Sequence, residues 1–317
     1  MFKWLRHTLA LLPFFLVTAC GGSNHTALVD VAPPSAKNIV QIAQANPQFS
    51  ILVEAVVAAR LDQVLSGPGP FTVFAPTNDA FASLLTELGV TKAQLLSNTP
   101  LLTAVLTYHV LPKKVARADI PLGLPITTVQ GAVFKIDAAS ADLVINDGRN
   151  RKSKIIATDI VASNGIIHAV DKVLLPPNLN VVETALANPD FSILVEAVSA
   201  AGLVDTLKTT SPITVFAPTN AAFAALLSEL NLTKAQLLAN TPLLTKVLTY
   251  HVVPKLLLKA QLPVNTAITS VEGEAINIDS NFVITDRRGR LSKIVATDIL
   301  TTNGVIHAID KVILPAP

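Results

Sequence analysis

The chain repeats itself at long range, and this repeat constrains the fold more than any other feature of the sequence. The segment 46–56 (NPQFSILVEAV) returns as 188–198 (NPDFSILVEAV). Further along, residues 91–112 match residues 233–254 at 19 of 22 positions. Solenoid repeats recur every ~20–50 residues. The period here is about 140 residues. A period of that length indicates two whole domains built on one pattern.

The spacing between the copies shrinks toward the end of each copy. The first match separates the copies by 142 residues. The motif ATDI at 157–160 recurs at 296–299, only 139 residues later. The second copy therefore lacks three residues, and the alignment places the gap between Ile278 and Val283. Loop tips tolerate such length changes better than strands do. The sequence predicts a hairpin turn of variable length at this point.

The repeat divides the chain into four parts. They are a leader (1–19), a tether that starts at Cys20 (20–36), domain 1 (37–176) and domain 2 (179–315). The tether is rich in Gly, Ser, Asn and Ala, a composition typical of a flexible linker. Between the domains lies only Pro-Pro-Asn at 176–178. So short and Pro-rich a linker is expected to limit hinge motion.

Within each copy, helical patterns come before strand patterns. Residues 49–65 place apolar side chains near a 3.6-residue period, which predicts one amphipathic helix. Later, β-branched runs such as 126–129 and 143–145 alternate with turn residues. Asn164-Gly165 and its counterpart in domain 2, Asn303-Gly304, predict type I′ hairpin turns. Helices segregated before strands favour an α+β fold over a doubly wound parallel sheet.

Composition excludes several classes of protein. Half of the 317 residues are apolar and 15% are charged, so the chain is not disordered through excess charge. A single cysteine excludes an intrachain disulfide framework and a multi-cysteine zinc site. Because Lys3 and Arg6 fall in the leader, the remaining chain carries 22 basic and 22 acidic residues. A neutral chain has no global charge that would recruit nucleic acid.

The leader predicts export and a lipid anchor. Lys3 and Arg6 precede an apolar run at 8–19, which is shorter than the ~20 residues needed to span a bilayer. The run ends in Val-Thr-Ala-Cys, which resembles a bacterial lipobox in which the thiol of Cys20 takes a diacylglyceryl group and palmitate-type chains. An ordinary secretory signal is the alternative. Gly21 after the cysteine implies sorting to the outer membrane of a Gram-negative bacterium.

Three blocks of each copy resemble the fasciclin domain. They are FTVFAPTNDAF (71–81), Tyr108-His109 and ATDIVASNGIIHAVDKVLLP (157–176), and all three recur in domain 2. The resemblance implies a compact β-wedge with flanking helices and a role in extracellular adhesion, or in binding matrix, polysaccharide or surface partners. In animal relatives the Tyr-His region is linked to integrin contact. By that resemblance the candidate binding residues are Tyr108, His109, Tyr250 and His251. Domain 2 departs from the pattern at Ala221, where domain 1 has Asp79.

The sequence offers no strong catalytic signal. It has no HExxH or HxxxH spacing for a metal and no GxSxG elbow for a hydrolase. We therefore expect no cofactor, no metal and no enzymatic activity, although a Ser-His-Asp triad assembled in space stays open. His109 and His168 lie among apolar neighbours, which favours buried structural histidines. Aspartates such as Asp159 and Asp298 border strands, where a carboxylate can accept backbone N–H groups.

Basic residues concentrate at one equivalent place in each copy. The two clusters hold 8 of the 22 Lys and Arg residues after the leader. They could be solvated hairpins whose charges discourage edge-to-edge aggregation, or a binding site for a polyanion such as acidic polysaccharide or lipopolysaccharide. The clusters are Arg149, Arg151, Lys152 and Lys154 in domain 1, and Arg287, Arg288, Arg290 and Lys293 in domain 2.

Three functions compete at this point. The first is a lipid-anchored, non-enzymatic adhesion or binding module that contacts acidic polysaccharide or surface proteins. The second is a periplasm-facing carrier of an apolar or pigment ligand. A hydrolase with an assembled triad ranks last. A large enclosed apolar cavity would favour the carrier, an exposed patch would favour adhesion, and a Ser-His-Asp cluster in a cleft would favour the enzyme.

Overall fold

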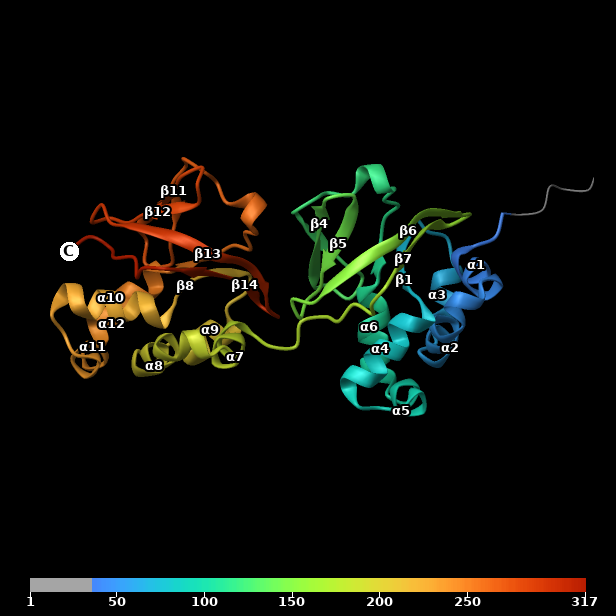
Figure 1. Ribbon diagram of the computed structural model, residues 1–317, viewed down its shortest axis with the longest axis horizontal. Helices are drawn as coiled ribbons and strands as arrows, with labels where there is room; N and C mark the ends of the chain where they lie inside the picture. The colour runs from blue at the N-terminus through green and yellow to red at the C-terminus, as the bar shows by residue number, and fades with distance from the viewer. Residues whose placement is uncertain (1–35) are drawn as a thin grey trace, which may run out of the picture. The chain divides into compact units, whose positions relative to one another are not determined.

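Each copy of the repeat folds into a seven-stranded sheet with helices packed against it (Figure 1). The structure is a computed structural model that describes residues 36–317, which form one compact unit. The leader, Cys20 and nearly all of the tether lie outside the described residues. The predicted α+β class is confirmed.

Domain 1 starts with helices and ends with strands, as its sequence predicts. With 3-10 helices labelled η, its elements are α1 (Ile39–Ala45), η1 (Pro47–Phe49), α2 (Ser50–Ala58), α3 (Asp62–Ser66), β1 (Phe71–Pro76), α4 (Asn78–Leu88), α5 (Lys92–Ser97), α6 (Thr99–Tyr108), β2 (Val110–Leu111), η2 (Arg117–Asp119), β3 (Pro125–Thr127), β4 (Val133–Ala139), β5 (Asp142–Asn146), β6 (Lys152–Ala162) and β7 (Gly165–Val170).

Domain 2 repeats this order of elements. They are α7 (Val181–Leu186), η3 (Pro189–Phe191), α8 (Ser192–Ala200), α9 (Val204–Thr209), β8 (Ile213–Pro218), α10 (Asn220–Leu230), α11 (Lys234–Ala239), α12 (Thr241–Tyr250), β9 (Val252–Val253), η4 (Lys259–Gln261), β10 (Ile268–Thr269), β11 (Ala275–Ile278), β12 (Val283–Thr285), β13 (Leu291–Leu300) and β14 (Gly304–Ile309).

The sheet brings the first and last strands of each domain together. Its order is β2-β1-β7-β6-β5-β4-β3 in domain 1 and the equivalent β9-β8-β14-β13-β12-β11-β10 in domain 2. The β1–β7 and β8–β14 pairs are parallel, and the other pairs are antiparallel. β11 and β12 form a shorter ladder than β4 and β5. The hairpin predicted between Ile278 and Val283 is therefore present, but the three missing residues shorten its strands and not its turn.

Two apolar cores fill each domain. In domain 1, one core lies between the helices and the sheet and includes Phe49 and Phe81. The other lies within the wedge of strands, where Phe74 and Tyr108 meet Phe134 edge-on at 5.2 and 5.8 Å between ring centroids. Figure 1 shows α4–α6 gathered at one end of the domain and β4 and β5 at the other. The second core is therefore separate from the helical one.

The single helix predicted over residues 49–65 is wrong. The structure has η1, α2 and α3 there, and α2 ends because Arg60 adopts a left-handed backbone with φ 57°. The N–H of Leu61 donates to the carbonyl of Val56 at 3.0 Å, which closes the end of the helix. Gly202 is the equivalent of Arg60 in domain 2 and has φ 68°. Glycine at this point of the second copy was the available signal for the break.

The type I′ turns predicted at Asn164-Gly165 and Asn303-Gly304 are also wrong. None of these four residues has a positive φ. Each glycine starts a strand, and close approach of the neighbouring backbone explains it. A Cβ on Gly165 would lie 2.1 Å from the carbonyl oxygen of Phe71, and the same distance applies on Gly304.

The asparagine of each Asn-Gly pair ties the hairpin end to the helices. Oδ1 of Asn164 accepts from the N–H of Ile39 at 3.0 Å, and its Nδ2 donates to the carbonyls of Leu65 and Gly67 at 2.8 and 2.9 Å. Asn303 makes the equivalent contacts in domain 2. The repeated Asn-Gly pair thus serves packing between elements rather than turn geometry.

Side chains of domain 1 contact domain 2 at the open side of β13. Nζ of Lys135 lies 2.7 Å from Oδ2 of Asp298, whose side chain is buried. Oδ1 of Asn150 accepts from the N–H of Leu300 at 2.8 Å. Val133 packs against the buried cluster that contains Leu300. We call this set of contacts the interdomain joint.

Candidate functional site

The β5–β6 turn of domain 1 carries the basic cluster and is held rigid by one carboxylate. Asp147 is buried and accepts the N–H groups of Arg149, Arg151 and Leu175 at 3.0, 2.9 and 3.0 Å. Burial raises the pKa of Asp147, and these N–H donors oppose the rise. Asp286 holds the β12–β13 turn of domain 2 through equivalent bonds. Both turns therefore present their side chains from a fixed backbone.

Several of the predicted polyanion-binding residues already face carboxylates. Arg151 lies 2.9 Å from Glu87 and 3.8 Å from Asp147, and Lys154 lies 3.1 Å from Asp142. These partners neutralise much of the predicted cationic patch in domain 1.

The same pairing recurs in domain 2. Arg290 pairs with Glu229 and Asp286, and Arg287 lies 3.5 Å from Glu274. In both copies, then, the arginine that follows the turn is directed toward its own domain and is not free for a partner.

Four basic residues of the clusters keep their charge available. Among residues 36–317, no carboxylate forms an ion pair with Arg149, Lys152, Arg288 or Lys293. Arg149 and Arg288 occupy equivalent positions and share one restraint. Their Nε atoms donate to the carbonyls of Pro176 and Pro315 at 3.4 and 3.0 Å. The candidate site is thus smaller than the sequence predicts and is centred on this repeated arginine.

The Tyr-His pairs lie inside the protein. Tyr108, His109, Tyr250 and His251 are at most 2% exposed. A partner on the surface cannot touch these side chains, so the contact residues implied by the resemblance are corrected to core residues.

Backbone groups satisfy the polar atoms of both Tyr-His pairs. The hydroxyl of Tyr108 donates to the carbonyl of Val133 at 2.8 Å. Nδ1 of His109 donates to the carbonyl of Val105 at 2.7 Å, and its Nε2 accepts from the N–H of Leu174 at 2.9 Å. Burial lowers the pKa of His109 to about 4, against which the carbonyl bond acts weakly. The ring is neutral, and both of its nitrogens are engaged.

The remaining two histidines of the domains are equally committed. Nε2 of His168 donates to the carbonyl of Val115 at 2.9 Å, and Nδ1 accepts from the N–H of Asp159 at 3.2 Å. His307 makes the matching bonds to Leu257 and Asp298. Burial lowers the pKa of both rings. None of the four histidines between residues 36 and 317 has a nitrogen free to take a proton from a serine.

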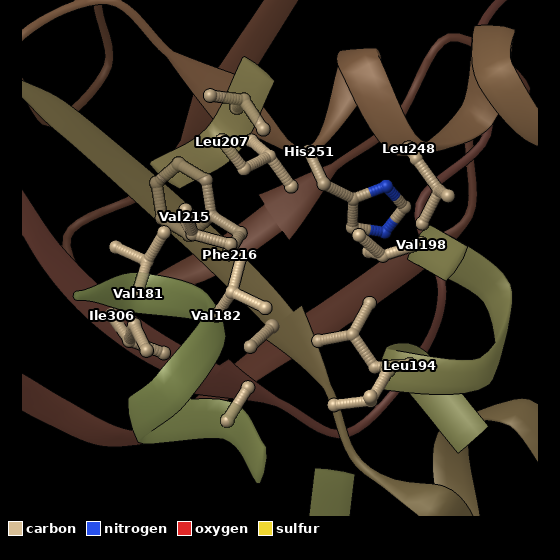
Figure 2. Close-up of a pocket in the computed structure, with 14 residues that line it drawn as sticks. Val181, Val182, Leu194, Val198, Leu207, Val215, Phe216, Leu248, His251 and Ile306 are labelled. Carbon is tan, nitrogen blue, oxygen red and sulfur yellow. The ribbon is translucent and has the colours of Figure 1, made fainter. Parts of the chain in front are cut away.

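The apolar cavity beneath β8 is too small for a pigment. Figure 2 shows the His251 ring among aliphatic side chains that include Val198 and Leu248. This cavity measures about 40 Å³, and its counterpart in domain 1 about 30 Å³. Pockets for drug-sized ligands measure ~300–1,000 Å³. These two spaces are about a tenth of that size or less, so neither can enclose a pigment.

One larger apolar cavity lies among the helices of domain 2. It has a volume of about 250 Å³ and is lined mainly by leucines of α10, α11 and α12, with Arg288 and His251 as its polar lining residues. His251 already has both ring nitrogens bonded. Arg288 is therefore the group that could meet the polar end of a molecule placed there.

Residues 36–317 contain neither a candidate metal site nor a candidate membrane-spanning helix. No group of three or more His, Cys, Asp or Glu side chains in this part of the chain is placed to hold a metal ion. No helix there is both long and apolar enough to cross a bilayer.

Comparison with known proteins identifies the same domain in both copies of the repeat. The family model for the fasciclin domain matches residues 47–176 and 189–315. Protein sll1483 of Synechocystis sp. is 43% identical over 147 residues, which are 46% of this chain and 77% of that protein. Transforming growth factor-beta-induced protein ig-h3 of Sus scrofa is 30% identical over 301 residues, 94% of this chain and 41% of that protein.

A solved FAS1 domain pair from the insect cell adhesion molecule Fasciclin I also matches. It covers 85% of this chain and 98% of its own, at 18% identity and a TM-score of 0.43.

Proposed function

The chain belongs to the fasciclin-domain family, and from that membership we propose that it is a non-enzymatic adhesion or binding protein of the bacterial cell envelope. The family's usual role is adhesion or binding at cell surfaces and matrix. The binding class we assign is an acidic polysaccharide or another polyanion of the surface.

The observation that carries this assignment is the repeated arginine, Arg149 and Arg288. Each sits on a turn fixed by a buried aspartate, and each has its Nε held by a proline carbonyl. The planar guanidinium suits carboxylates, sulfates and phosphates because it donates in a fixed fork. Little side-chain freedom is left to lose on binding, so more of the contact energy is retained.

The presence of one such arginine in each domain makes the proposed site bivalent. Two linked contacts raise avidity without any new interaction, provided one polymer can reach both. A polysaccharide chain repeats its acidic groups, so a chain long enough to span both arginines would meet that condition. Exposed charges are screened beyond ~10 Å at 0.1 M salt, so binding should weaken steeply as salt rises.

The test compares two variants of equal charge. Arg149→Ser with Arg288→Ser removes the repeated arginine, whereas Lys92→Ser with Lys234→Ser removes two exposed lysines that pair with Glu54 and Glu196. Retention on immobilised dextran sulfate and polygalacturonate is measured at low and physiological salt. We expect the arginine variant to bind about tenfold more weakly and the lysine variant to bind like wild type. Equal retention of all three proteins would reject the polyanion site.

We propose further that Cys20 anchors the protein to the outer membrane. Two or three acyl chains hold a protein firmly, at ~0.8 kcal/mol per buried CH₂. Cys20→Ser should leave folding unchanged, since residue 20 precedes both domains, and should release the protein from the membrane fraction. Membrane partitioning and a radiolabelled acyl group that both persist in the serine variant would exclude the lipid anchor.

A second candidate function, carriage of a small apolar ligand, has one observation in its favour. The cavity of about 250 Å³ in domain 2 has apolar walls and Arg288 in its lining. That volume suits part of a single acyl chain with an acidic head and is too small for a pigment. Leu226→Trp would fill the cavity. Binding of a fluorescent fatty acid by wild type, and not by this variant, would support the carrier.

A further inference from the structure

The joint between the domains covers a surface that domain 1 leaves open on itself. Asp298 and Leu300 of β13 correspond to Asp159 and Val161 of β6, at matching positions of the repeated block that begins with ATDI. Leu300 is 3% exposed, whereas Val161 is 65% exposed. The same position is therefore buried in one copy and bare in the other.

The open surface has the same backbone design as the covered one. Asp159 and Asp298 both adopt a left-handed backbone, with φ 59° and 62°. Their carboxylates accept the N–H groups of Arg117 and Lys259 at 2.8 and 2.6 Å. A non-glycine residue with a left-handed backbone costs free energy, and such residues cluster at sites that bind a partner or switch conformation. In domain 2 the strained aspartate receives Lys135.

The strand edge beside this aspartate is unpaired in domain 1. β5 pairs with β6 only through Lys152, Ser153 and Lys154, so the rest of that side of β6 has no registered strand among the described residues. Val161 faces Ile166 in the register in which Leu300 faces Val305. Its N–H and C=O therefore point to the open side, as those of Leu300 do.

The joint shows what chemistry fits such an edge. The amide of Asn150 bonds both backbone groups of Leu300, accepting at 2.8 Å and donating at 3.4 Å. Lys135 supplies the charge for Asp298, and Val133 supplies the apolar cover. A lysine, a side-chain amide and a β-branched residue together satisfy the surface.

We propose that the open edge of β6, with Asp159 and Val161, docks a protein strand edge that carries a lysine and a side-chain amide. Exposed strand edges recruit partner chains by strand addition. The partner's lysine meets Asp159, and its amide meets the backbone of Val161.

The partner is a different protein and not the chain itself. Lys135 and Asn150 are used in the joint, and domain 2 has Asn277 and Gly289 in their places. The tether, residues 20–36, contains no lysine or arginine. This surface is also separate from the repeated arginine, so the polyanion proposal and this one fail independently.

The test moves the donor residues onto domain 2 of the whole chain. Ala275→Val, Asn277→Lys and Gly289→Asn copy Val133, Lys135 and Asn150. Gly289 has φ 71° and Asn150 has φ 61°, so asparagine fits that backbone. All proteins carry Cys20→Ser, which keeps a lipid anchor out of the measurement. Sedimentation should show head-to-tail oligomers that grow with concentration, while the unmodified chain stays monomeric.

A mixing experiment identifies the surface. The triple variant with Val161→Glu presents only the donor edge, and the unmodified chain presents only the acceptor. We expect neither to self-associate and the mixture to form a 1:1 complex, which Asp159→Asn in the acceptor weakens at least tenfold. Circular dichroism checks that every variant is folded. A folded triple variant that stays monomeric, or oligomers unchanged by Val161→Glu, would overturn the proposal.

Discussion

Domain 1 and domain 2 place the same side chains at the same depth in their cores, whereas their strand edges carry different residues. Tyr108 and Tyr250 are both fully buried and donate to equivalent carbonyls. At the edges, Lys135 and Asn150 of domain 1 stand where domain 2 has other residues. Such a division indicates that the two copies share one folding requirement and differ in what they contact.

Lowering the pH should destabilise both domains strongly and to a similar extent, because each core contains an equivalent buried histidine. Burial lowers the pKa of His109 and of His251 to about 4, below ~6.5 in an unfolded chain. The unfolded state then binds more protons between these values. The free energy of unfolding is therefore highest above pH ~6.5 and falls as the pH drops toward 4, by about 3 kcal/mol for each histidine.

Urea titrations from pH 7 to pH 4 measure this loss. His109→Asn should reduce the pH dependence of domain 1, to which His168 also contributes, and leave that of domain 2 unchanged. An equal slope in wild type and variant would show that His109 does not carry the effect.

The next effect tests the close approach of backbone at the hairpin ends. A Cβ on Gly165 or Gly304 would lie 2.1 Å from a carbonyl oxygen of the parallel strand, so Gly165→Ala should force the two strands apart. We expect a loss of about 2–3 kcal/mol, and the same for Gly304→Ala. Thermal unfolding measures both. Ser163→Ala, in the same turn, should change little, and a Gly165→Ala protein of wild-type stability would contradict this explanation of the Asn-Gly pair.

Removal of Lys135 should destabilise the protein in a way that the equivalent change in domain 2 does not, because only Lys135 makes this contact. Lys135→Ala leaves the buried carboxylate of Asp298 without its cation, and unpaired buried charges are costly. Since the lysine keeps some contact with solvent, we expect about 2 kcal/mol, felt in domain 2 although the change lies in domain 1. Hydrogen exchange of β13 measures it. Asn277→Ala at the equivalent exposed position should leave exchange unaltered, and equal effects of the two changes would refute the joint.

The smallest effect concerns the first turn of one helix in each copy. α4 has Asp79 there, and α10 has Ala221 and no acidic residue. A negative charge near a helix N-terminus contributes ~0.3–1 kcal/mol. Asp79→Ala should lower, and Ala221→Asp should raise, the stability of its own domain by that amount at low salt. The difference should shrink in 1 M salt, and a salt-independent difference would point to packing instead.

Much of the fold could be predicted from the sequence because its signals are local. Helices before strands, the length change after Ile278 and buried histidines all follow from short patterns. The helix break at Arg60 was missed because only domain 2 has glycine there. The role of Asn164 was missed because its partners, Ile39 and Leu65, are distant in sequence.

The candidate site was predicted only in outline. The basic turns were found, but the carboxylates that neutralise Arg151 come from other elements. The joint was not predicted at all. Lys135 and Asp298 are distant in sequence, and no pattern around either residue points to the other. Differences between the copies at the positions of Lys135 and Asn150 were visible, but only the structure gives them a meaning.

The parallel pairing of β1 with β7 has a consequence for how the chain is made. Phe71 pairs with Gly165, so the centre of the first sheet is incomplete until nearly the whole domain has been synthesised. Long-range pairings of this kind slow folding, and domains generally fold as units in the order of synthesis. We expect domain 1 to close before β8 meets β14, with Lys135 still facing water. The ion pair with Asp298 is then among the last contacts to form, and it marks the moment at which both sheets are complete.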